Sequence, residues 1–368
     1  MLRSGAAARG QARRLYSSTA APSDVVIVSA ARTPIGSFNG SLSKMSCTQL
    51  GSVAVAAAVE RAGISGADVG EVYLGNVLPA NAGQAPSRQI ALGAGIPNTV
   101  PTTDVNKVCA SGMKTIMFAA QSIQLGYEDI VVAGGFESMS NIPMYVPKGV
   151  PAYGHGQLLD GLLRDGLTDV YNDVHMGMCG EKCATDYGIS REEQDDFALR
   201  SYELAQKSVA EGLFAAEIAP VPVPQGRGRE PKMFTEDEEP ANFRGADKLT
   251  GLRPAFTKEG SITAANASKL NDGACAVVVM SRAKAEALGA DPRLHPRLRG
   301  RRPRSDGLHH RTRRDRPEGG RARRREHGGH RPARDQRGVR GGRPRQCEAA
   351  RHPDREAQRP RWCASAHS

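Results

Sequence analysis

The sequence lacks any long hydrophobic run, and none of its 368 residues lie in a segment approaching the roughly 20 consecutive apolar residues that a membrane-spanning helix needs. We therefore expect a soluble mature chain with no membrane partner. Aromatic residues are scarce, at 5%, and the seven cysteines show no paired spacing. Free thiols are expected rather than a disulfide framework.

The last 78 residues, 291–368, contain no Lys, Ile, Phe, Tyr, Met or Asn. They hold 24 arginines and nine acidic residues, which gives this tail a net charge of +15. Because the whole chain carries +11, residues 1–290 are slightly acidic, at −4. A segment without apolar periodicity cannot bury a core, so we expect the tail to be mostly disordered.

The first 23 residues lack acidic side chains and contain four arginines among several serines and alanines. This composition is typical of a mitochondrial transit peptide, and Arg14-Leu15-Tyr16-Ser17-Ser18 is similar to a processing region. We therefore expect residues 1–23 to direct the chain to the mitochondrial matrix. An ordinary disordered basic end is the alternative.

Between these two ends, apolar runs alternate with segments of helical spacing. The predicted strands are 24–31, 71–77, 103–108, 130–133 and 275–280, and the predicted helices are 47–62, 84–93, 111–127 and 190–211. This alternation predicts a layered α/β fold with a mixed or parallel sheet. Residues 141–257 show weaker periodicity and many glycines and prolines, which indicates an insertion that covers a site.

Cys109 lies where a predicted strand ends and a predicted helix begins. Unpaired amides and the helix dipole stabilise a thiolate at a helix N-terminus, so a cysteine there can be a nucleophile. A buried structural cysteine is the alternative, because free cysteines are usually buried. The small neighbours Ala110, Ser111 and Gly112 leave room for a substrate. Local sequence alone leaves both interpretations open.

Two other motifs are weak when taken alone. The pair Gly134-Gly135 follows a predicted strand and allows close backbone approach, but it does not fit the dinucleotide-binding fingerprint. His175, Cys179 and Cys183 lie close together in sequence, yet no second cysteine pair follows them. A structural metal needs four ligands, so we predict no metal site at these thiols.

Several motifs, in this order and spacing, resemble those of the thiolase family across residues 24–290. They are Val28–Gly36, Asn106–Lys114, Gly134–Ser140, His175–Gly177 and Asn266–Gly273. The mitochondrial, biosynthetic acetyl-CoA acetyltransferase branch is the most similar. The resemblance implies a layered α-β-α-β-α fold of two similar halves and a homo-oligomer, either dimer or tetramer. This chain then supplies the first half, 24–140 and 258–290, with 141–257 as the covering insertion.

The resemblance also implies the chemistry. Cys109 attacks acetyl-CoA to give an acetyl-enzyme, and a second acetyl-CoA is deprotonated and condenses with it to acetoacetyl-CoA. No covalently bound cofactor is implied. Ser268 is implied to contact coenzyme A, as are Arg244 and Lys248 in the insertion. His175 and Met176 are implied to line the tunnel for the pantetheine arm.

A potassium ion is the remaining implied ligand. Its implied neighbours are Tyr202, which also lies at the coenzyme site, Ala264, Ala265 and Ala267. Carbonyl oxygens of small residues suit a hard, weakly bound cation. A tight backbone turn is the alternative explanation for the three alanines.

The chain lacks the groups that would complete this chemistry. Thiolases carry Asn-Glu-Ala-Phe, Gly-His-Pro and Cys-x-Gly-Gly segments in their second half, and none occurs here. These segments supply oxyanion donors, the activating histidine and the acid–base cysteine. The tail segment Arg334–Arg340 can be encoded as CGA GAT CAA CGA GGC GTT CGC, and dropping the first base yields Glu-Ile-Asn-Glu-Ala-Phe. We infer a one-nucleotide frame slip near residues 289–297 and expect negligible condensing activity.

A nucleic-acid-binding tail is the competing hypothesis, suggested by the arginine–glycine segment Arg337–Arg343. Such tails gain affinity from phosphate contacts and from aromatic stacking. Trp362 is the only aromatic residue of the tail, and interspersed acidic residues oppose phosphate. Acetyl-CoA and acetoacetyl-CoA are therefore the expected partners, and nucleic acid is the less favoured one.

Overall fold

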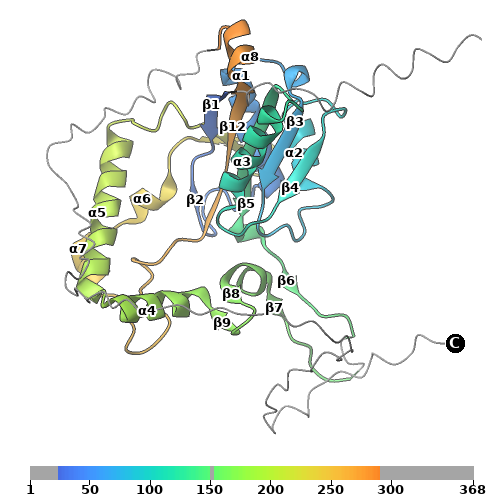
Figure 1. Cartoon of the computed structure of the whole chain (residues 1–368). Helices are drawn as coiled ribbons and strands as arrows, with labels where there is room; N and C mark the ends of the chain where they lie inside the picture. Colours follow the sequence, from blue (N-terminus) through green and yellow to red (C-terminus); the bar gives the residue numbers. More distant parts are fainter. Residues whose placement is uncertain (1–23, 150–152, 291–368) are drawn as a thin grey trace, which may run out of the picture. The chain divides into compact units, whose positions relative to one another are not determined.

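The computed structural model describes residues 24–149 and 153–290, and its centre is a six-stranded sheet (Figure 1). The strand order is β1 (Val25–Arg32), β12 (Asn271–Ser281), β5 (Ile130–Ser138), β3 (Glu71–Gly75) and β4 (Thr102–Val105), with the short β2 (Gly36–Ser37) also paired to β12. Pairing is antiparallel from β1 through β12 to β5 and parallel from β5 through β3 to β4. The sheet is therefore mixed. The expected transit peptide and arginine-rich tail lie outside the described residues.

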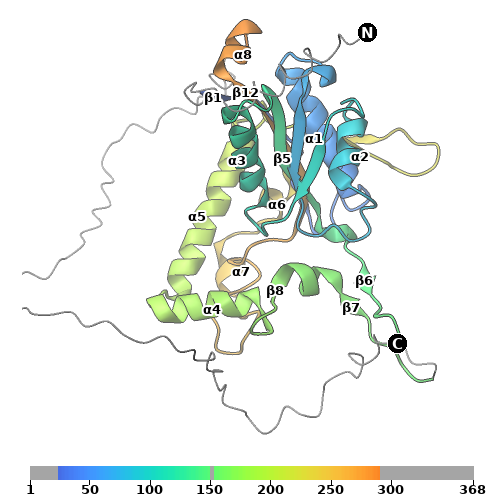
Figure 2. The same ribbon diagram turned by 45° about the vertical axis from the view of Figure 1, so that its right-hand side comes forward.

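Helices pack on both faces of this sheet (Figure 2). On one face lie α1 (Cys47–Arg61) and α2 (Pro86–Gly93), and on the other lies α3 (Ser111–Gln124). Helix α1 begins with a capping box, in which Ser46 Oγ accepts from Gln49 N while Gln49 Oε1 accepts from Ser46 N. Its buried side chains include Leu50, Ala54 and Ala58, which belong to the hydrophobic core between this helix and the sheet. The layered α/β prediction is confirmed for these residues.

Strand β12 enters the middle of the sheet from the far end of the described chain. It pairs with β1 from Val25↔Ser281 to Arg32↔Cys275, and with β5 from Asp272↔Ser138 to Met280↔Ile130. The short helix α8 (Arg282–Ala287) follows it directly. The segment after the insertion therefore belongs to the same sheet as β1, the first strand of the described chain.

Each predicted strand differs in extent from the observed one, and the largest differences are at β3, which ends at Gly75 rather than at 77, at β12, which begins at Asn271 rather than at 275, and at β4 and β5. The strand predicted over 130–133 continues to Ser138, because Gly134 and Gly135 are part of it rather than of a following loop. A Cβ at Gly134 would lie 2.1 Å from Cys275 O, so the strand pair tolerates only glycine there. The strand predicted over 103–108 ends at Val105, since Val108 adopts a left-handed backbone with φ of 49°.

The insertion, residues 141–257, adds no strand to the central sheet within the described chain. It forms the hairpins β6 (Met144–Tyr145) with β7 (Leu159–Asp160), β8 (Thr168–Asp169) with β9 (Val174–His175), and β10 (Val221–Val223) with β11 (Lys232–Phe234). Its helices are α4 (Met176–Tyr187), α5 (Arg191–Ala210), α6 (Glu238–Asn242) and α7 (Ala246–Thr250), besides a π-helical turn at Leu162–Leu167. The remaining short helices are 3-10 turns at Gly66–Asp68 and Met139–Asn141. In the described part of the chain, no helix combines the length and apolarity needed to cross a membrane.

An ionic anchor, defined here as Arg32, Glu217 and Asp237, ties the insertion to the end of β1. The Arg32 guanidinium donates to both carboxylate oxygens of Asp237, at 2.7 and 2.9 Å, and to Glu217 at 2.7 Å. Burial acts to lower the pKa of Arg32, but the bonds to Asp237 and Glu217 outweigh it and raise the pKa. A bidentate pair of this kind fixes orientation as well as distance.

Candidate active site

Cys109 lies in a tight turn between β4 and α3, and its side chain is exposed. Val108, just before it, has a φ of 49°, a conformation that β-branched residues rarely adopt. Ser111 Oγ accepts from Lys107 N at 2.9 Å and donates to Val108 O at 2.6 Å. Strained backbone held by such bonds is typical of functional turns. The exposed position of Cys109 contrasts with Cys47, whose burial raises its pKa to about 11.

The helix that follows Cys109 starts without a side-chain cap. Ala110 is the N-cap residue of α3 and forms no capping hydrogen bond, whereas Ser46, Ser190 and Ser281 cap α1, α5 and α8. The amide of Ser111, the first residue of the helix, already donates to Val108 O at 3.0 Å. Cys109 directly precedes the N-cap residue, at the end of α3 where the helix dipole favours negative charge.

Glycine lets α3 approach the sheet closely at this point. A Cβ at Gly75, the last residue of β3, would lie 2.7 Å from Ser111 Cβ. Thr115 Oγ1, one turn further along α3, donates to Gly134 O at 2.9 Å. These contacts fix the first turn of α3, and with it the Cys109 turn, against the end of β3 and the middle of β5.

Glu137, at the end of β5, anchors the loop that follows β3. Its carboxylate accepts from Asn76 Nδ2 at 2.8 Å, from Val77 N at 2.9 Å and from Leu78 N at 3.3 Å. Burial raises the pKa of Glu137, although the bonds from Val77, Leu78 and Asn76 act to lower it. A buried carboxylate that accepts several N–H groups fixes a loop firmly.

Asn106 connects this loop to the Cys109 turn. Its Nδ2 donates to Val77 O at 3.1 Å, and its Oδ1 accepts from Val108 N at 3.0 Å. A chain of hydrogen bonds thus runs from Glu137 through Val77 and Asn106 to the residue before Cys109. Sequence reasoning missed this chain; the one available signal was a single carboxylate closing an otherwise apolar strand that contains a glycine pair.

The residues expected at the coenzyme form a second group, in the insertion and the loop before β12. A cavity of about 210 Å³, here the Arg244 cavity, is lined by Tyr202, Arg244, Lys248, Ala264 and Ala265 together with other residues. A neighbouring cavity of about 400 Å³, here the Ser268 cavity, is lined by Tyr202, Ala267 and Ser268 among others. The structure therefore brings most of the predicted coenzyme and potassium residues together. Cys109 lines neither of these cavities.

The loop 263–268 is shaped by hydrogen bonds within itself and by one to α5. Asn266 Nδ2 donates to Asp195 Oδ1 at 2.9 Å, and Asn266 Oδ1 accepts from Thr263 N at 2.7 Å. Asp195 in turn pairs with Arg191 at 2.7 Å. Tyr202, further along α5, stacks on Phe243 with ring centroids 4.7 Å apart. These contacts hold the alanine carbonyls and Ser268 beside α5.

His175 and Met176 lie at the start of α4, outside the lining of both cavities. His175 caps the helix, because its Nδ1 accepts from Gly177 N at 2.9 Å, and its ring stacks on Phe256 at 4.9 Å. The side chain of Met176 is exposed. Within residues 24–149 and 153–290, no three His, Cys, Asp or Glu side chains group as potential metal ligands.

The expected potassium neighbours do not fit such an ion in this chain. Lys269 Nζ donates to Ala264 O at 2.8 Å and lies 5.9 Å from the centroid of the Tyr202 ring. A potassium ion and an ammonium group carry the same charge and need the same carbonyl oxygen. Lys269 therefore already uses one of the carbonyl oxygens, that of Ala264, that the resemblance gives to potassium.

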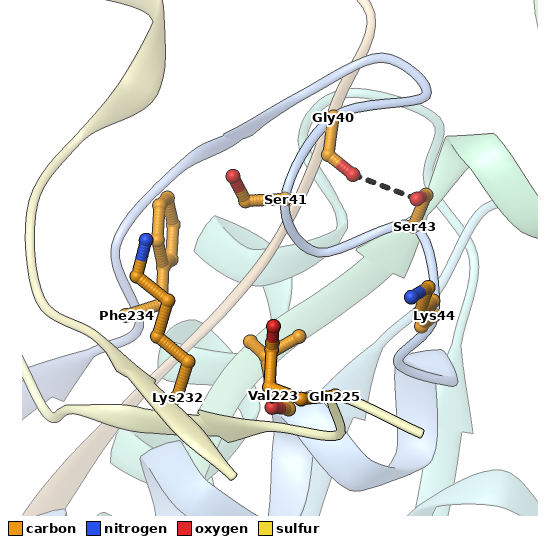
Figure 3. Close-up of a pocket in the computed structure, with 8 residues that line it drawn as sticks. All are labelled: Gly40, Ser41, Ser43, Lys44, Val223, Gln225, Lys232 and Phe234. Atoms are coloured by element: carbon orange, nitrogen blue, oxygen red, sulfur yellow. Dashed lines mark hydrogen bonds between the residues drawn. The ribbon is translucent and has the colours of Figure 1, made fainter. Parts of the chain in front are cut away.

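A third cavity, of about 280 Å³, separates the loop after β2 from the hairpin of β10 and β11 (Figure 3). Its neutral donors are already engaged: Ser43 Oγ donates to Gly40 O, Ser41 Oγ to Glu238, and Gln225 Nε2 to Val223 O. The other polar side chains that line it are the lysines 44 and 232. It therefore adds no group to the chemistry of the Cys109 turn.

Comparisons with known proteins give one consistent answer. A family model described as the N-terminal domain of thiolase matches residues 25–283. The mitochondrial acetyl-CoA acetyltransferase of Danio rerio is 51% identical over 282 residues, which cover 76% of this chain and 66% of that protein. The cytosolic acetyl-CoA acetyltransferase of Gibberella zeae is 54% identical over 270 residues, which cover 73% of this chain and 68% of that protein.

The crystal structure of the Acat5 thiolase of Ascaris suum in complex with coenzyme A is also similar. Its TM-score is 0.68 at 44% sequence identity, over 73% of this chain and 69% of that one. The chain thus spans about two thirds of the length of the relatives it matches. By its matched domain, its identity to these relatives and its fold, the chain belongs to the thiolase family.

Proposed function

We propose that this chain is the first half of an acetyl-CoA acetyltransferase, with Cys109 as the residue that accepts the acetyl group. The observation that carries the proposal is the exposed Cys109 in a braced, strained turn before the uncapped start of α3. Cys109 Sγ, as a thiolate, attacks the carbonyl carbon of acetyl-CoA. The bond from that carbon to the coenzyme sulfur breaks, and coenzyme A leaves as a thiolate that takes a proton from solvent.

We assign the coenzyme to the Arg244 and Ser268 cavities. Arg244 and Lys248 supply positive charge for its phosphates, and no carboxylate is among the described residues that line the Arg244 cavity. The relative from Ascaris suum binds coenzyme A, which supports this assignment. His175 and Met176 remain proposed neighbours of the pantetheine arm. Potassium is left out of the mechanism, because Lys269 lies on the carbonyl of Ala264.

The condensation itself needs groups that this chain lacks. We propose the α-β-α-β-α fold, the oligomer and full activity only for an intact member, in which 24–140 and 258–290 form the first half and 141–257 the covering insertion. Acetyl transfer to Cys109 is then the furthest step that this chain reaches. We further propose, from their composition, that residues 1–23 direct it to the mitochondrial matrix; of the two relatives described above, one is mitochondrial and the other cytosolic.

The test is acetylation of the purified chain by acetyl-CoA, followed by peptide mass spectrometry. Cys179 and Cys183 are also exposed and serve as internal references for unspecific acetylation. We expect Cys109 to gain an acetyl group faster than both, and we expect no measurable thiolysis of acetoacetyl-CoA. Equal rates at the three thiols would refute the role of Cys109, and measurable thiolysis would refute the incomplete mechanism.

The frame-slip hypothesis has a separate test. Sequencing the transcript over codons 285 to 340 shows whether Arg334–Arg340 is encoded by bases that spell Asn-Glu-Ala-Phe in the shifted frame. If these codons do not, the hypothesis is wrong, and the origin of the arginine-rich tail lies elsewhere.

A further inference from the structure

Lys269 is placed unusually for an exposed lysine. Its ammonium donates to a backbone carbonyl, Ala264 O, at 2.8 Å, and lies within cation–π range of Tyr202, at 5.9 Å from the ring centroid. It lines both the Arg244 and the Ser268 cavities. Among the ion pairs formed by the described residues, none includes Lys269. Its charge is therefore directed at the loop 264–267 rather than at a carboxylate.

We propose that the Lys269 ammonium is a tethered substitute for a monovalent metal ion at the loop 264–267. An ammonium and such an ion carry the same charge, and both are stabilised by carbonyl oxygens and by an aromatic face. The inference rests on the proposed function, since this loop also carries Ser268. Because the cation is part of the chain, the loop keeps its conformation whatever the concentration of potassium.

The surrounding charges favour one cation at this loop and oppose a second. Arg244 and Lys248 line the Arg244 cavity together with Lys269, and no carboxylate is among the described residues that line it. The Ser268 cavity, which Lys269 also lines, includes one carboxylate, that of Glu239. A free ion beside Lys269 would meet three positive side chains at short range. A cavity with these positive side chains suits phosphate groups. The Lys269 ammonium therefore has two effects: it stabilises the loop through Ala264 O, and it adds to the attraction for an anion.

Thermal unfolding of the full chain in three salts of equal ionic strength tests the proposal. We compare potassium chloride, sodium chloride and choline chloride, whose large cation does not fit between carbonyl oxygens. The wild-type chain should unfold at the same midpoint in all three. Lys269→Met keeps the apolar length and removes the charge; it should lower the midpoint in choline chloride by about 1–3 °C, and potassium chloride should restore it.

Two further variants sharpen the result. Lys269→Arg retains the charge and should unfold like the wild type in every salt. Lys114→Met is the matched control, because Lys114 Nζ also lies over a ring, 4.2 Å from the centroid of Phe118, but donates to no carbonyl of this loop. Its midpoint should not respond to the choice of cation.

Three results would overturn the proposal. They are a wild-type midpoint raised specifically by potassium, a Lys269→Met midpoint in choline chloride equal to that of the wild type, and a lowered Lys269→Met midpoint that potassium does not restore. Calorimetric titration of the wild type with coenzyme A in choline chloride forms a separate arm. If coenzyme A does not bind, the proposed function fails, while the unfolding result still decides the role of Lys269.

Discussion

The two faces of the central sheet differ in how far their apolar side chains are buried, as alternate residues of β12 show. On the face of α1 and α2, Ala274, Ala276, Val278 and Met280 are all buried. On the face of α3, Val279 is the one buried apolar residue of β12, and Cys275 is exposed. Among the described residues, the buried cluster on the α3 face has five members, which are Ala119, Ile123, Val131, Ala133 and Val279.

The outer side of α3 continues this difference. Met113 and Met117 are 67% and 47% exposed, and Leu125 and Tyr127 at the end of the helix are exposed as well. A helix with apolar residues on both its inner and its outer side belongs between two layers rather than at a surface. The α1 face is therefore covered by its own helices, whereas the α3 face leaves apolar surface for a further layer, which we assign to the second half of an intact thiolase.

The largest expected effect separates the two faces by stability. Leu50→Ala, in the α1 face, removes a side chain that is 0% exposed and should lower the free energy of unfolding by about 2–5 kcal/mol. Met117→Ala on α3 should change it by less than about 0.5 kcal/mol, because its environment is half solvent. Urea unfolding followed by circular dichroism measures both. Similar losses for the two variants would mean that the α3 face is already packed.

The second prediction concerns self-association of the uncovered face. Burying one methionine side chain contributes about 1.5–3 kcal/mol, so Met113 and Met117 should drive contacts between chains. The double variant Met113→Lys, Met117→Lys should be more monomeric than the wild type in sedimentation velocity, while α3 persists because lysine is a good helix former.

Leu204→Lys provides the matched control for this experiment. Leu204 is similarly exposed but lies on α5 in the insertion. It should leave the distribution of species close to that of the wild type. If the control lowers association as much as the α3 variant does, general surface charge explains the result and the α3 face is not special.

The third prediction concerns the hydrogen bonds that run from Glu137 through Val77 and Asn106 to Val108 and hold the Cys109 turn before α3. Glu137→Gln places an amide donor against Val77 N or Leu78 N and loosens the loop that holds Asn106. Alkylation of Cys109 by iodoacetamide should slow about two- to fivefold, the size of a typical helix-terminus effect. The rates at Cys179 and Cys183 should stay constant, as mass spectrometry of the peptides can show.

Two further variants test whether this change in alkylation rate passes through the hydrogen bonds of Asn106. Asn106→Asp keeps the acceptor for Val108 N but loses the donor to Val77 O, so it should reproduce the slower alkylation. Glu238→Gln is the matched control: Glu238 also anchors a loop through backbone amides, those of Ser37 and Ser41, away from Cys109. An unchanged rate in folded Glu137→Gln would contradict the bracing role.

The smallest effect is a difference in pH dependence between these two carboxylates. Burial raises the pKa of Glu137 above its ordinary 4.5, so its contribution to stability is present below that value and lost as pH rises through the raised pKa. For Glu238, burial acts to raise the pKa, but bonds from Ser41 and Ser37 lower it. Its contribution is present above 4.5 and lost as pH falls through the lowered pKa.

The two Gln variants should therefore change the acid limb of stability in opposite senses. Without Glu238, the free energy of unfolding should fall less as pH drops below about 4.5. Without Glu137, the loss of stability between acid and neutral pH should become smaller. Urea midpoints across this pH range measure both slopes, and slopes of the same sign would show that burial, rather than the backbone bonds, dominates at Glu238.

The sequence predicts the regular elements well where the signal is local. Helix α1 starts at Cys47 as predicted, and Ser190, the first residue of the helix predicted over 190–211, is the N-cap residue of α5. Local patterns fail to predict the extent of a strand where pairing with a sequence-distant strand determines it. The glycine pair belongs to β5 because β12 passes so close, and Cys275 is far from it in sequence.

The candidate site shows the same division. The resemblance singles out Cys109 and the residues expected at the coenzyme, and the structure gathers most of the expected coenzyme residues around two cavities. Two other contacts depend on tertiary geometry. Glu137 accepts from Val77 N, 60 residues away in sequence, and Lys269 donates to Ala264 O. A motif names the residue type at a position, but it does not name the atom that the side chain contacts.

The central place of β12 has a consequence for how the chain is made. Val25 pairs with Ser281, so β1 has no neighbour in the sheet until nearly all of the described chain has left the ribosome. Such distant pairing is slow to form and leaves strand edges open during synthesis. Strand β12 ends at Ser281, ahead of the arginine-rich tail, so a change of reading frame near residues 289–297 would leave all six strands of the central sheet in frame.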